Sequence, residues 1–175
     1  MSRLLIVVDY QKDFVDGALG FPGAVALEGP ILRKIEAYRR AGDTVAFTFD
    51  THGEDYLSTQ EGRSLPIPHT LRGTPGWELY GKVRQTRQEG DPCFYKPAFG
   101  SAELFDYLRA HPFDSIELVG VVSSICVISN AVLAKAAQPE TPVTVDAACV
   151  AGADSHLHEA ALDVMQGLQI AVTGR

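Results

Sequence analysis

The chain has 175 residues, of which 46% are hydrophobic and 21% charged, a composition typical of a folded globular protein rather than a disordered chain. Its 15 basic and 22 acidic residues give a net charge of −7, so we expect no general attraction for nucleic acid or for anionic membranes. The three cysteines show no paired spacing, which argues against a disulfide framework and predicts a cytoplasmic protein.

The first fifty residues alternate between strand-like and helix-like patterns. Residues 4–8 form a continuous apolar run, which predicts a strand buried on both faces and is too short for a signal peptide or a membrane span. Apolar residues recur at helical spacing over residues 31–38, and Gly42 follows as a stop signal. Residues 45–49 predict a second strand, which ends at Asp50.

The rest of the chain contains one long polar segment and four more strand patterns. Residues 51–92 are rich in glycine, proline and polar residues, and a connection of this length is usually functional, as a cover over a site or as a contact with a neighbouring subunit. Ser101 and Asp154 are placed to cap helices, and residues 127–137 predict a helix of small residues. The further strands are predicted at residues 93–95, 116–122, 143–145 and 168–172.

Six strands separated mostly by helices predict an α/β fold. We expect one domain, residues 1–175, with a six-stranded, mostly parallel sheet and helices on both faces. In such sheets the site lies at the carboxyl ends of the strands, near the switch in strand order. The polar residues that follow the strands should therefore gather on one edge; they are Asp9, Asp50, His52, Lys96 and residues 123–126.

Cys126 is the strongest candidate for a nucleophile. It follows a predicted buried strand and a polar turn and opens a predicted helix, whose N-terminus would favour the thiolate and offer free N–H groups to an oxyanion. A lone cysteine is nevertheless more often a buried structural residue, and we interpret Cys93 and Cys149 in that way.

Asp9 and Lys96 each follow an apolar strand. From its position Asp9 is equally a loop cap and a general base, and Lys96 alone is more often a surface lysine with a buried stem. Taken with Cys126, they form a Cys/Asp/Lys set suited to acyl transfer through a thioester.

Asp50 and His52 form a second candidate cluster. Residues two apart on an extended chain point to the same side, so both could bind one metal ion, with His69 as a third ligand. One carboxylate and two imidazoles leave positions open for water or substrate. The pattern alone fits hydrogen-bonded polar residues at a strand end equally well.

Five segments stand out in chain order: residues 8–14 (VDYQKDF), 50–52 (DTH), 69–76 (HTLRGTPG), 96–102 (KPAFGSA) and 120–127 (GVVSSICV). Together they resemble the isochorismatase-like cysteine hydrolase family, and within it the nicotinamidase-related branch. Asp50-Thr51-His52 resembles the first two metal ligands of that branch, and true isochorismatases lack the metal set.

The resemblance implies a three-layer α/β/α sandwich and a set of roles. Asp9 would be the catalytic acid and base, Lys96 its charged partner, and Cys126 the nucleophile. Val121-Val122 stands in the place of a cis peptide found in the family, where the N–H groups of Val122 and Cys126 would form an oxyanion hole.

The same resemblance implies one divalent transition metal at Asp50, His52 and His69, with zinc as the first choice and iron or manganese as alternatives. The metal would orient the substrate ring, directly or through a bridging water. Phe14 would pack against the substrate. Homo-oligomers are common in the family, so we expect one here.

Three departures from the family pattern concern the substrate more than the chemistry. Thr70 replaces the usual cysteine, Pro66 replaces a tryptophan that faces the ring, and Ser58 replaces an additional histidine ligand. Trp77 or Phe99 could supply the missing aromatic wall.

We therefore expect hydrolysis of a small carboxamide, with nicotinamide as the first candidate. An alternative substrate is an N-carbamoyl or ureido compound, whose carboxylate would need an arginine, Arg72 or Arg63. A further alternative is a catalytically silent protein that binds a metal or ligand. The joint presence of Asp9, Lys96 and Cys126 in matching motifs argues against that last interpretation.

Overall fold

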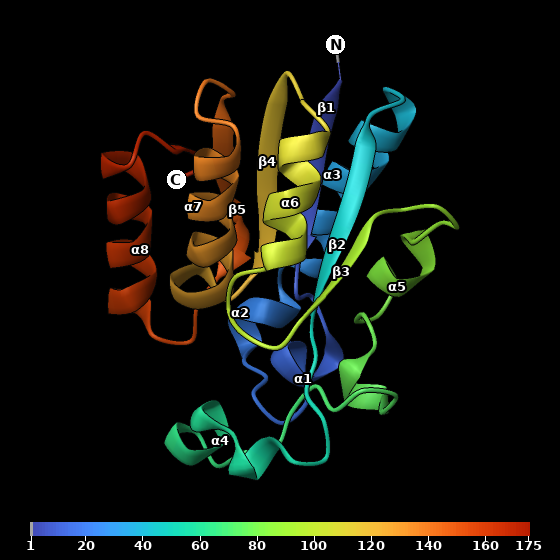
Figure 1. Ribbon diagram of the computed structural model, residues 1–175, viewed down its shortest axis with the longest axis vertical. Helices are drawn as coiled ribbons and strands as arrows, with labels where there is room; N and C mark the ends of the chain where they lie inside the picture. Colours follow the sequence, from blue (N-terminus) through green and yellow to red (C-terminus); the bar gives the residue numbers. More distant parts are fainter. Residues whose placement is uncertain (1) are drawn as a thin grey trace.

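A six-stranded sheet runs through the centre of the computed structural model, which describes residues 2–175 (Figure 1). All neighbouring strands are parallel, and their order is β3–β2–β1–β4–β5–β6. The order therefore switches sides between β1 and β4, which is where parallel sheets place their ligand site. The strands are β1 (Arg3–Val8), β2 (Thr44–Asp50), β3 (Cys93–Lys96), β4 (Ser115–Val121), β5 (Val143–Ala151) and β6 (Ala171–Thr173).

Helices cover both faces of the sheet, so the predicted three-layer α/β/α sandwich is confirmed. Helices α6, α7 and α8 pack on one face, in front of the sheet in Figure 1, and α1, α2 and α3 pack on the other. The helices are α1 (Lys12–Val15), α2 (Pro22–Val25), α3 (Glu28–Arg40), α4 (Gln60–Ser64), α5 (Val83–Thr86), α6 (Ala102–Ala110), α7 (Ile128–Ala137) and α8 (Ser155–Gly167).

The central strand β1 shows why its sequence is apolar throughout. Leu4 and Ile6 contribute to the core beneath α6, α7 and α8, whereas Leu5 and Val7 contribute to the core beneath α3. Both sets are fully buried, and each such side chain stabilises the fold by about 1.5–3 kcal/mol relative to an exposed one. A strand between two helical layers has no face left for polar residues.

The predicted caps are confirmed, and the bounds of two predicted strands, β5 and β6, differ from the prediction by more than one residue. The side chain of Ser101 accepts a hydrogen bond from the Leu104 N–H, and that of Asp154 accepts one from the Leu157 N–H. β5 continues to Ala151 because it pairs with β4 again after a shift in register, so Cys149 lies inside the strand. β6 is shorter than predicted.

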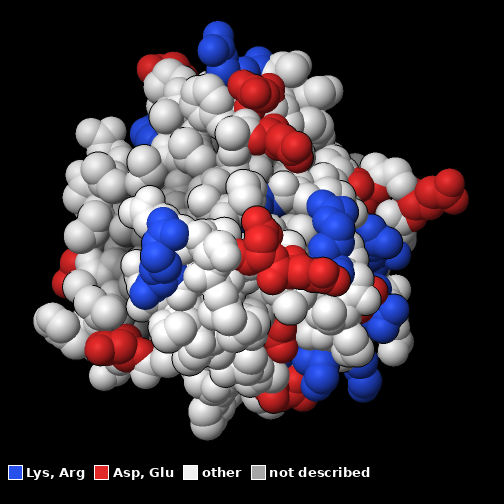
Figure 2. All heavy atoms as spheres, turned by 60° about the horizontal axis from the view of Figure 1, so that its bottom comes forward, with Lys and Arg blue, Asp and Glu red and all other residues white. Residues whose placement is uncertain are grey.

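Charged side chains of both signs occur together on the surface. Figure 2 turns the end of the molecule that carries α1 and α4 towards the viewer, and acidic and basic side chains are intermixed there. On the left of this view, the visible surface is mostly white, with a few acidic and basic side chains. Within residues 2–175, no helix is long and apolar enough to cross a membrane.

Candidate active site

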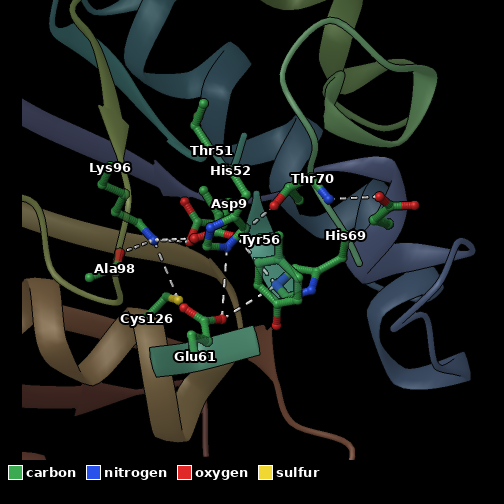
Figure 3. A network of polar contacts seen from close by, with 12 residues as sticks. Asp9, Thr51, His52, Tyr56, Glu61, His69, Thr70, Lys96, Ala98 and Cys126 are labelled. Atoms are coloured by element: carbon green, nitrogen blue, oxygen red, sulfur yellow. Dashed lines mark hydrogen bonds and ion pairs between the residues drawn. The ribbon is translucent and has the colours of Figure 1, made fainter. Parts of the chain in front are cut away.

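Four neighbouring strands bring the candidate residues to one edge of the sheet (Figure 3). Asp9 directly follows β1, and Asp50 and Lys96 are the last residues of β2 and β3, paired in register. Cys126 lies in a π-helical turn, Ser123–Val127, between β4 and α7. The structure thus brings together side chains that are more than a hundred positions apart in the sequence.

Lys96 lies at the centre of this group. Its Nζ atom is 2.6 Å from Asp9 Oδ2 and 3.5 Å from Cys126 Sγ, and it donates a hydrogen bond to the Ala98 carbonyl at 3.0 Å. The Lys96 side chain is only 1% exposed, so these contacts replace its hydration. This burial differs from the common pattern of a surface lysine with a solvated amine.

The charges in the group are set by burial and by one another. Burial raises the pKa of the Cys126 thiol, the Asp9 carboxylate raises it further, and Lys96 opposes both. Burial also raises the pKa of Asp9, against the charge of Lys96. Burial opposes the charge of Lys96, but Asp9, Cys126 and Asp50 outweigh it and raise the Lys96 pKa. Lys96 therefore stays cationic, and Cys126 rests as a neutral thiol.

This electrostatic setting corrects one expectation. Cys126 lies inside the π-helical turn, two positions before α7 begins at Ile128, so it is not the opening residue of a regular helix. Deep burial and the neighbouring Asp9 carboxylate raise its pKa. The thiol therefore needs a base in contact with it to become a nucleophile.

Asp9 is held rigidly and is incompletely hydrogen-bonded. Thr48 Oγ1 donates to Asp9 Oδ1 at 2.6 Å, and the Asp9 N–H donates to the Thr48 carbonyl at 3.2 Å. The buried Oδ2 has no hydrogen-bond partner of normal geometry among residues 2–175, and it faces the Lys96 charge. Because Thr48 occupies Oδ1, Oδ2 is the atom at which Asp9 would accept a proton.

Asp50, His52 and His69 form a second cluster beside the first. Asp50 Oδ2 lies 2.9 Å from His52 Nε2 and 3.5 Å from His69 Nε2, and one ligand atom from each residue fits within 4.8 Å. Burial opposes the charge of Asp50, but His52, Lys96 and Thr70 together lower its pKa, so it is ionised.

The donor atoms of this cluster fit a transition metal. His69 Nδ1 lies 2.8 Å from the Ile67 carbonyl, which places the proton on Nδ1 and leaves the Nε2 lone pair free. His52 Nε2 is buried without a hydrogen-bond partner among residues 2–175. A buried nitrogen of this kind, with a carboxylate and a second imidazole beside it, suits zinc or a similar divalent ion.

Two residues contact the metal cluster in ways that the sequence did not predict. Glu61 in α4 places Oε1 3.5 Å from His69 Nε2 and 3.8 Å from His52 Nε2. It is one acid among many in a polar segment, so no pattern indicated it. Thr70, noted only as a departure, donates from Oγ1 to Asp50 Oδ2 at 2.6 Å.

Asn130 joins the lysine loop to the cysteine turn and was also missed. Its Nδ2 donates to the carbonyls of Cys126 at 2.8 Å and Phe99 at 3.1 Å, and its Oδ1 accepts from the Ser101 N–H at 3.0 Å. The side chain is fully buried. The spacing of four residues from Cys126 on a helix was the one available signal.

A cavity of about 300 Å³ opens above Cys126. Phe14, which packs 5.5 Å from the His69 ring, lines it together with Phe99 and Val122. The peptide bond between Val121 and Val122 is cis, as the resemblance implies. The other lining residues are Leu19, Phe21, Asp50, Glu61, Leu65, His69, Ser124, Ile125, Ala153, Asp154 and Leu157.

Trp77 lies outside this cavity, in contrast to our expectation of an aromatic wall. Its Nε1 donates to Thr51 Oγ1 at 2.9 Å, and its ring stacks on Tyr95 with centroids 5.8 Å apart. These contacts hold it against Thr51, which follows β2, and Tyr95 in β3. Of the two aromatic candidates, the structure brings only Phe99 to the cavity.

Comparisons with known proteins agree with the geometry. The family model described as "Isochorismatase domain" matches residues 3–175. The chain is 30% identical to the nicotinamidase/pyrazinamidase of Mycobacterium tuberculosis, with 94% of each chain aligned.

Two solved structures are similar over almost the whole chain. The pyrazinamidase of Pyrococcus horikoshii in complex with zinc has a TM-score of 0.86 and 26% identity, with both chains fully covered. The N-carbamoylsarcosine amidase of Thermoplasma acidophilum has a TM-score of 0.81 and 26% identity, covering 99% of this chain and 96% of the other.

Proposed function

The chain belongs to the isochorismatase family and is an amide-bond hydrolase, and on that premise we propose that it cleaves a small carboxamide through a thioester on Cys126. The proposed substrate is nicotinamide, and the products are nicotinate and ammonia. One observation carries the mechanism: a buried cation, Lys96 Nζ, contacts both the Asp9 carboxylate and the Cys126 sulfur.

In the first half of the reaction, Asp9 takes the thiol proton from Cys126. The thiolate attacks the amide carbon, and the carbonyl oxygen becomes an oxyanion held by the N–H groups of Val122 and Cys126. Asp9 then returns the proton to the leaving nitrogen, the C–N bond breaks, and ammonia departs. The acyl group remains on the Cys126 sulfur.

In the second half, water replaces the sulfur. Asp9 takes a proton from the water, whose oxygen attacks the thioester carbon, and the C–S bond breaks. The proton returns to the Cys126 sulfur and the carboxylic acid is released. Lys96 keeps its proton throughout and stabilises the negative charge as it moves between Asp9 and Cys126.

Asp50, His52 and His69 would hold one divalent metal, for which we propose zinc. Glu61 lies close enough to the same two imidazole nitrogens to complete the set. When bound, the metal would act as a Lewis acid that orients the ring nitrogen of the substrate or a water beside it. Phe14 and Phe99 would contact the ring.

The arginine that an N-carbamoyl or ureido substrate would need is not in the cavity. Arg72 lies over the rings of Trp77 and Tyr95, and Arg63 donates to the Ser58 carbonyl; neither lines the cavity. The amide substrate therefore has more support than the ureido one. A silent binding protein has no need of the Asp9–Lys96–Cys126 contacts.

The test is ammonia release from nicotinamide by the zinc-loaded protein, in parallel with Cys126→Ala and the matched control Cys93→Ala. We expect release from the wild type and from Cys93→Ala, and a loss of about a thousandfold or more in Cys126→Ala. Rapid quenching should give a wild-type adduct with the mass of one nicotinoyl group. If Cys126→Ala retains turnover, Cys126 is not the nucleophile. If intact, zinc-loaded protein releases no ammonia, nicotinamide is not the substrate.

A further inference from the structure

Three large apolar side chains stand exposed around the mouth of the cavity. Phe99 is 46% exposed, Ile125 41% and Leu157 52%, and all three line the cavity that contains Cys126. They come from separate parts of the chain: the loop after β3, the turn of Cys126, and the first turn of α8. We call these three residues the apolar rim. Exposed apolar groups that converge in this way mark a binding surface.

The charge of the cavity lining has one sign. Its charged residues are Asp50, Glu61 and Asp154, and within residues 2–175 the lining includes no lysine or arginine. The nearby Lys96 is buried and paired with Asp9. With zinc held at Asp50 and Glu61, the charge that remains in the lining is Asp154, at the start of α8. A tail carboxylate at the rim would therefore meet this acidic group and no basic side chain of the lining.

The cavity is also larger than one aromatic ring needs. A volume of about 300 Å³ is at the lower end of the range that holds drug-sized ligands. A ring-sized amide with its carbonyl at Cys126 would leave the rim uncovered. A longer substrate would cover it and remove apolar surface from water.

We propose that the substrate class of this site is primary amides with an uncharged apolar tail, and that the tail lies on the apolar rim. This inference rests on the proposed amidase function and narrows it. The rim is continuous with the wall that reaches Cys126, so the natural occupant is the substrate itself. A second copy of the chain seated on the rim would lie across the entrance.

The measurement is kcat/KM for zinc-loaded protein on the linear series from butanamide to octanamide, with nicotinamide alongside. A methylene that becomes fully buried raises kcat/KM about fourfold, because remote binding energy contributes to the transition state. We expect a rise of about two- to fourfold for each methylene that reaches the rim. Glutaramate, which ends in a carboxylate, should react at least about tenfold more slowly than pentanamide.

The tail contact is tested by Leu157→Ser, with Val164→Ser as its matched control. Leu157 and Val164 both lie on α8 and are both 52% exposed, but Val164 does not line the cavity. Leu157→Ser should lower the ratio of kcat/KM for octanamide to that for butanamide by about fivefold. Val164→Ser should leave the ratio unchanged.

The possible outcomes separate this inference from the proposed function. If nicotinamide is hydrolysed but kcat/KM does not change along the series, the proposed apolar-tail substrate class is wrong and the proposed amidase function is kept. If long amides react and nicotinamide does not, the tail class stands and nicotinamide is wrong. If Leu157→Ser changes the oligomeric state in sedimentation but not the ratio, the rim is a contact between copies and the inference fails. If no amide reacts, both fail.

Discussion

Two clusters of buried charge lie in the same sheet, and they are built differently. In the first, on the α3 side, Lys34 Nζ contacts Glu117 at 2.8 Å and Asp146 at 2.7 Å, and the Tyr38 hydroxyl donates to Glu117 at 2.7 Å. We call these four residues the α3 cluster. The second is the site cluster, Asp9, Asp50 and Lys96, at the carboxyl ends of the strands.

Both clusters hold a lysine between two carboxylates, yet only the site cluster borders the cavity above Cys126. Every member of the α3 cluster has a polar partner, and Lys34 remains half-buried at the surface. In the site cluster, Asp9 Oδ2 is paired with the Lys96 charge, but within residues 2–175 neither this oxygen nor the neighbouring His52 Nε2 makes a hydrogen bond of normal geometry. The site cluster borders the cavity through Asp50. Incomplete hydrogen bonding, rather than buried charge itself, therefore distinguishes the cluster for which we propose catalysis from the α3 cluster.

The strongest test of this difference is Asp9→Asn. The amide keeps the shape and can still accept the Thr48 hydrogen bond, but it cannot take a proton. We expect kcat/KM for amide hydrolysis to fall by about 10²- to 10⁴-fold. Lys34→Met, in the α3 cluster, should change it by less than about twofold. Equal losses in the two variants would show that charge clusters in this sheet act through stability alone.

The second test concerns the metal. His69→Ala removes one of three converging donor atoms, and we expect zinc affinity to fall by at least about a hundredfold. Even mutation of a residue that only hydrogen-bonds to a metal ligand lowers metal affinity by about 10- to 100-fold. Zinc should raise the thermal midpoint of the wild type and not that of His69→Ala. The control is His156→Ala, an exposed histidine on α8. Zinc content is measured per chain after dialysis, and full occupancy in His69→Ala would contradict the site.

The third test concerns stability. Lys34→Met leaves Glu117 and Asp146 without their cation, and we expect the free energy of unfolding to fall by about 2 kcal/mol. The exposed Lys82→Met should change it by less than about 0.5 kcal/mol. Urea unfolding followed by circular dichroism gives both values. If Lys34→Met has the same free energy of unfolding as the wild type, the α3 cluster contributes no net stability.

The smallest expected effect is on the pH dependence of stability, and it comes from a pair of residues beside the α3 cluster. Arg3 packs over Tyr38 and donates hydrogen bonds to Asp43. Burial by itself would raise the pKa of Asp43, but the hydrogen bonds from Arg3 outweigh it and lower that pKa. The folded-state pKa is therefore below the unfolded value of about 3.9, so the pair stabilises the fold above that pH and loses this effect as the pH falls through the folded value. The urea midpoints of the wild type and Asp43→Asn should converge between about pH 5 and pH 2. A difference that stays constant with pH would contradict this origin.

Much of this architecture could be predicted from the sequence because strong local patterns set it. A buried parallel strand such as residues 4–8 needs apolar side chains on both faces, and the residue after such a strand reaches the edge where sites form. Asp9, Asp50, Lys96 and Cys126 were located in this way. The lengths of β5 and β6 were not, because they depend on pairing with neighbouring strands.

The site details that were missed depend on contacts between distant segments. Glu61 belongs to a short helix in a polar segment, and only the folded chain brings it to His52 and His69. Trp77 is as aromatic as Phe99, and nothing in its neighbours shows that its indole donates to Thr51. The raised pKa of Cys126 comes from burial and from Asp9, and neither is visible in the residues around it.

Asn130 has a consequence for how this sequence can diverge. Its one carboxamide serves three backbone groups, two as donor and one as acceptor, across the loop after Lys96 and the turn of Cys126. Aspartate offers no donor, leucine offers neither function, and glutamine shifts the amide by one carbon. A descendant could replace Asn130 only if it supplied new partners for all three groups at once, so this position should be among the slowest in the chain to drift.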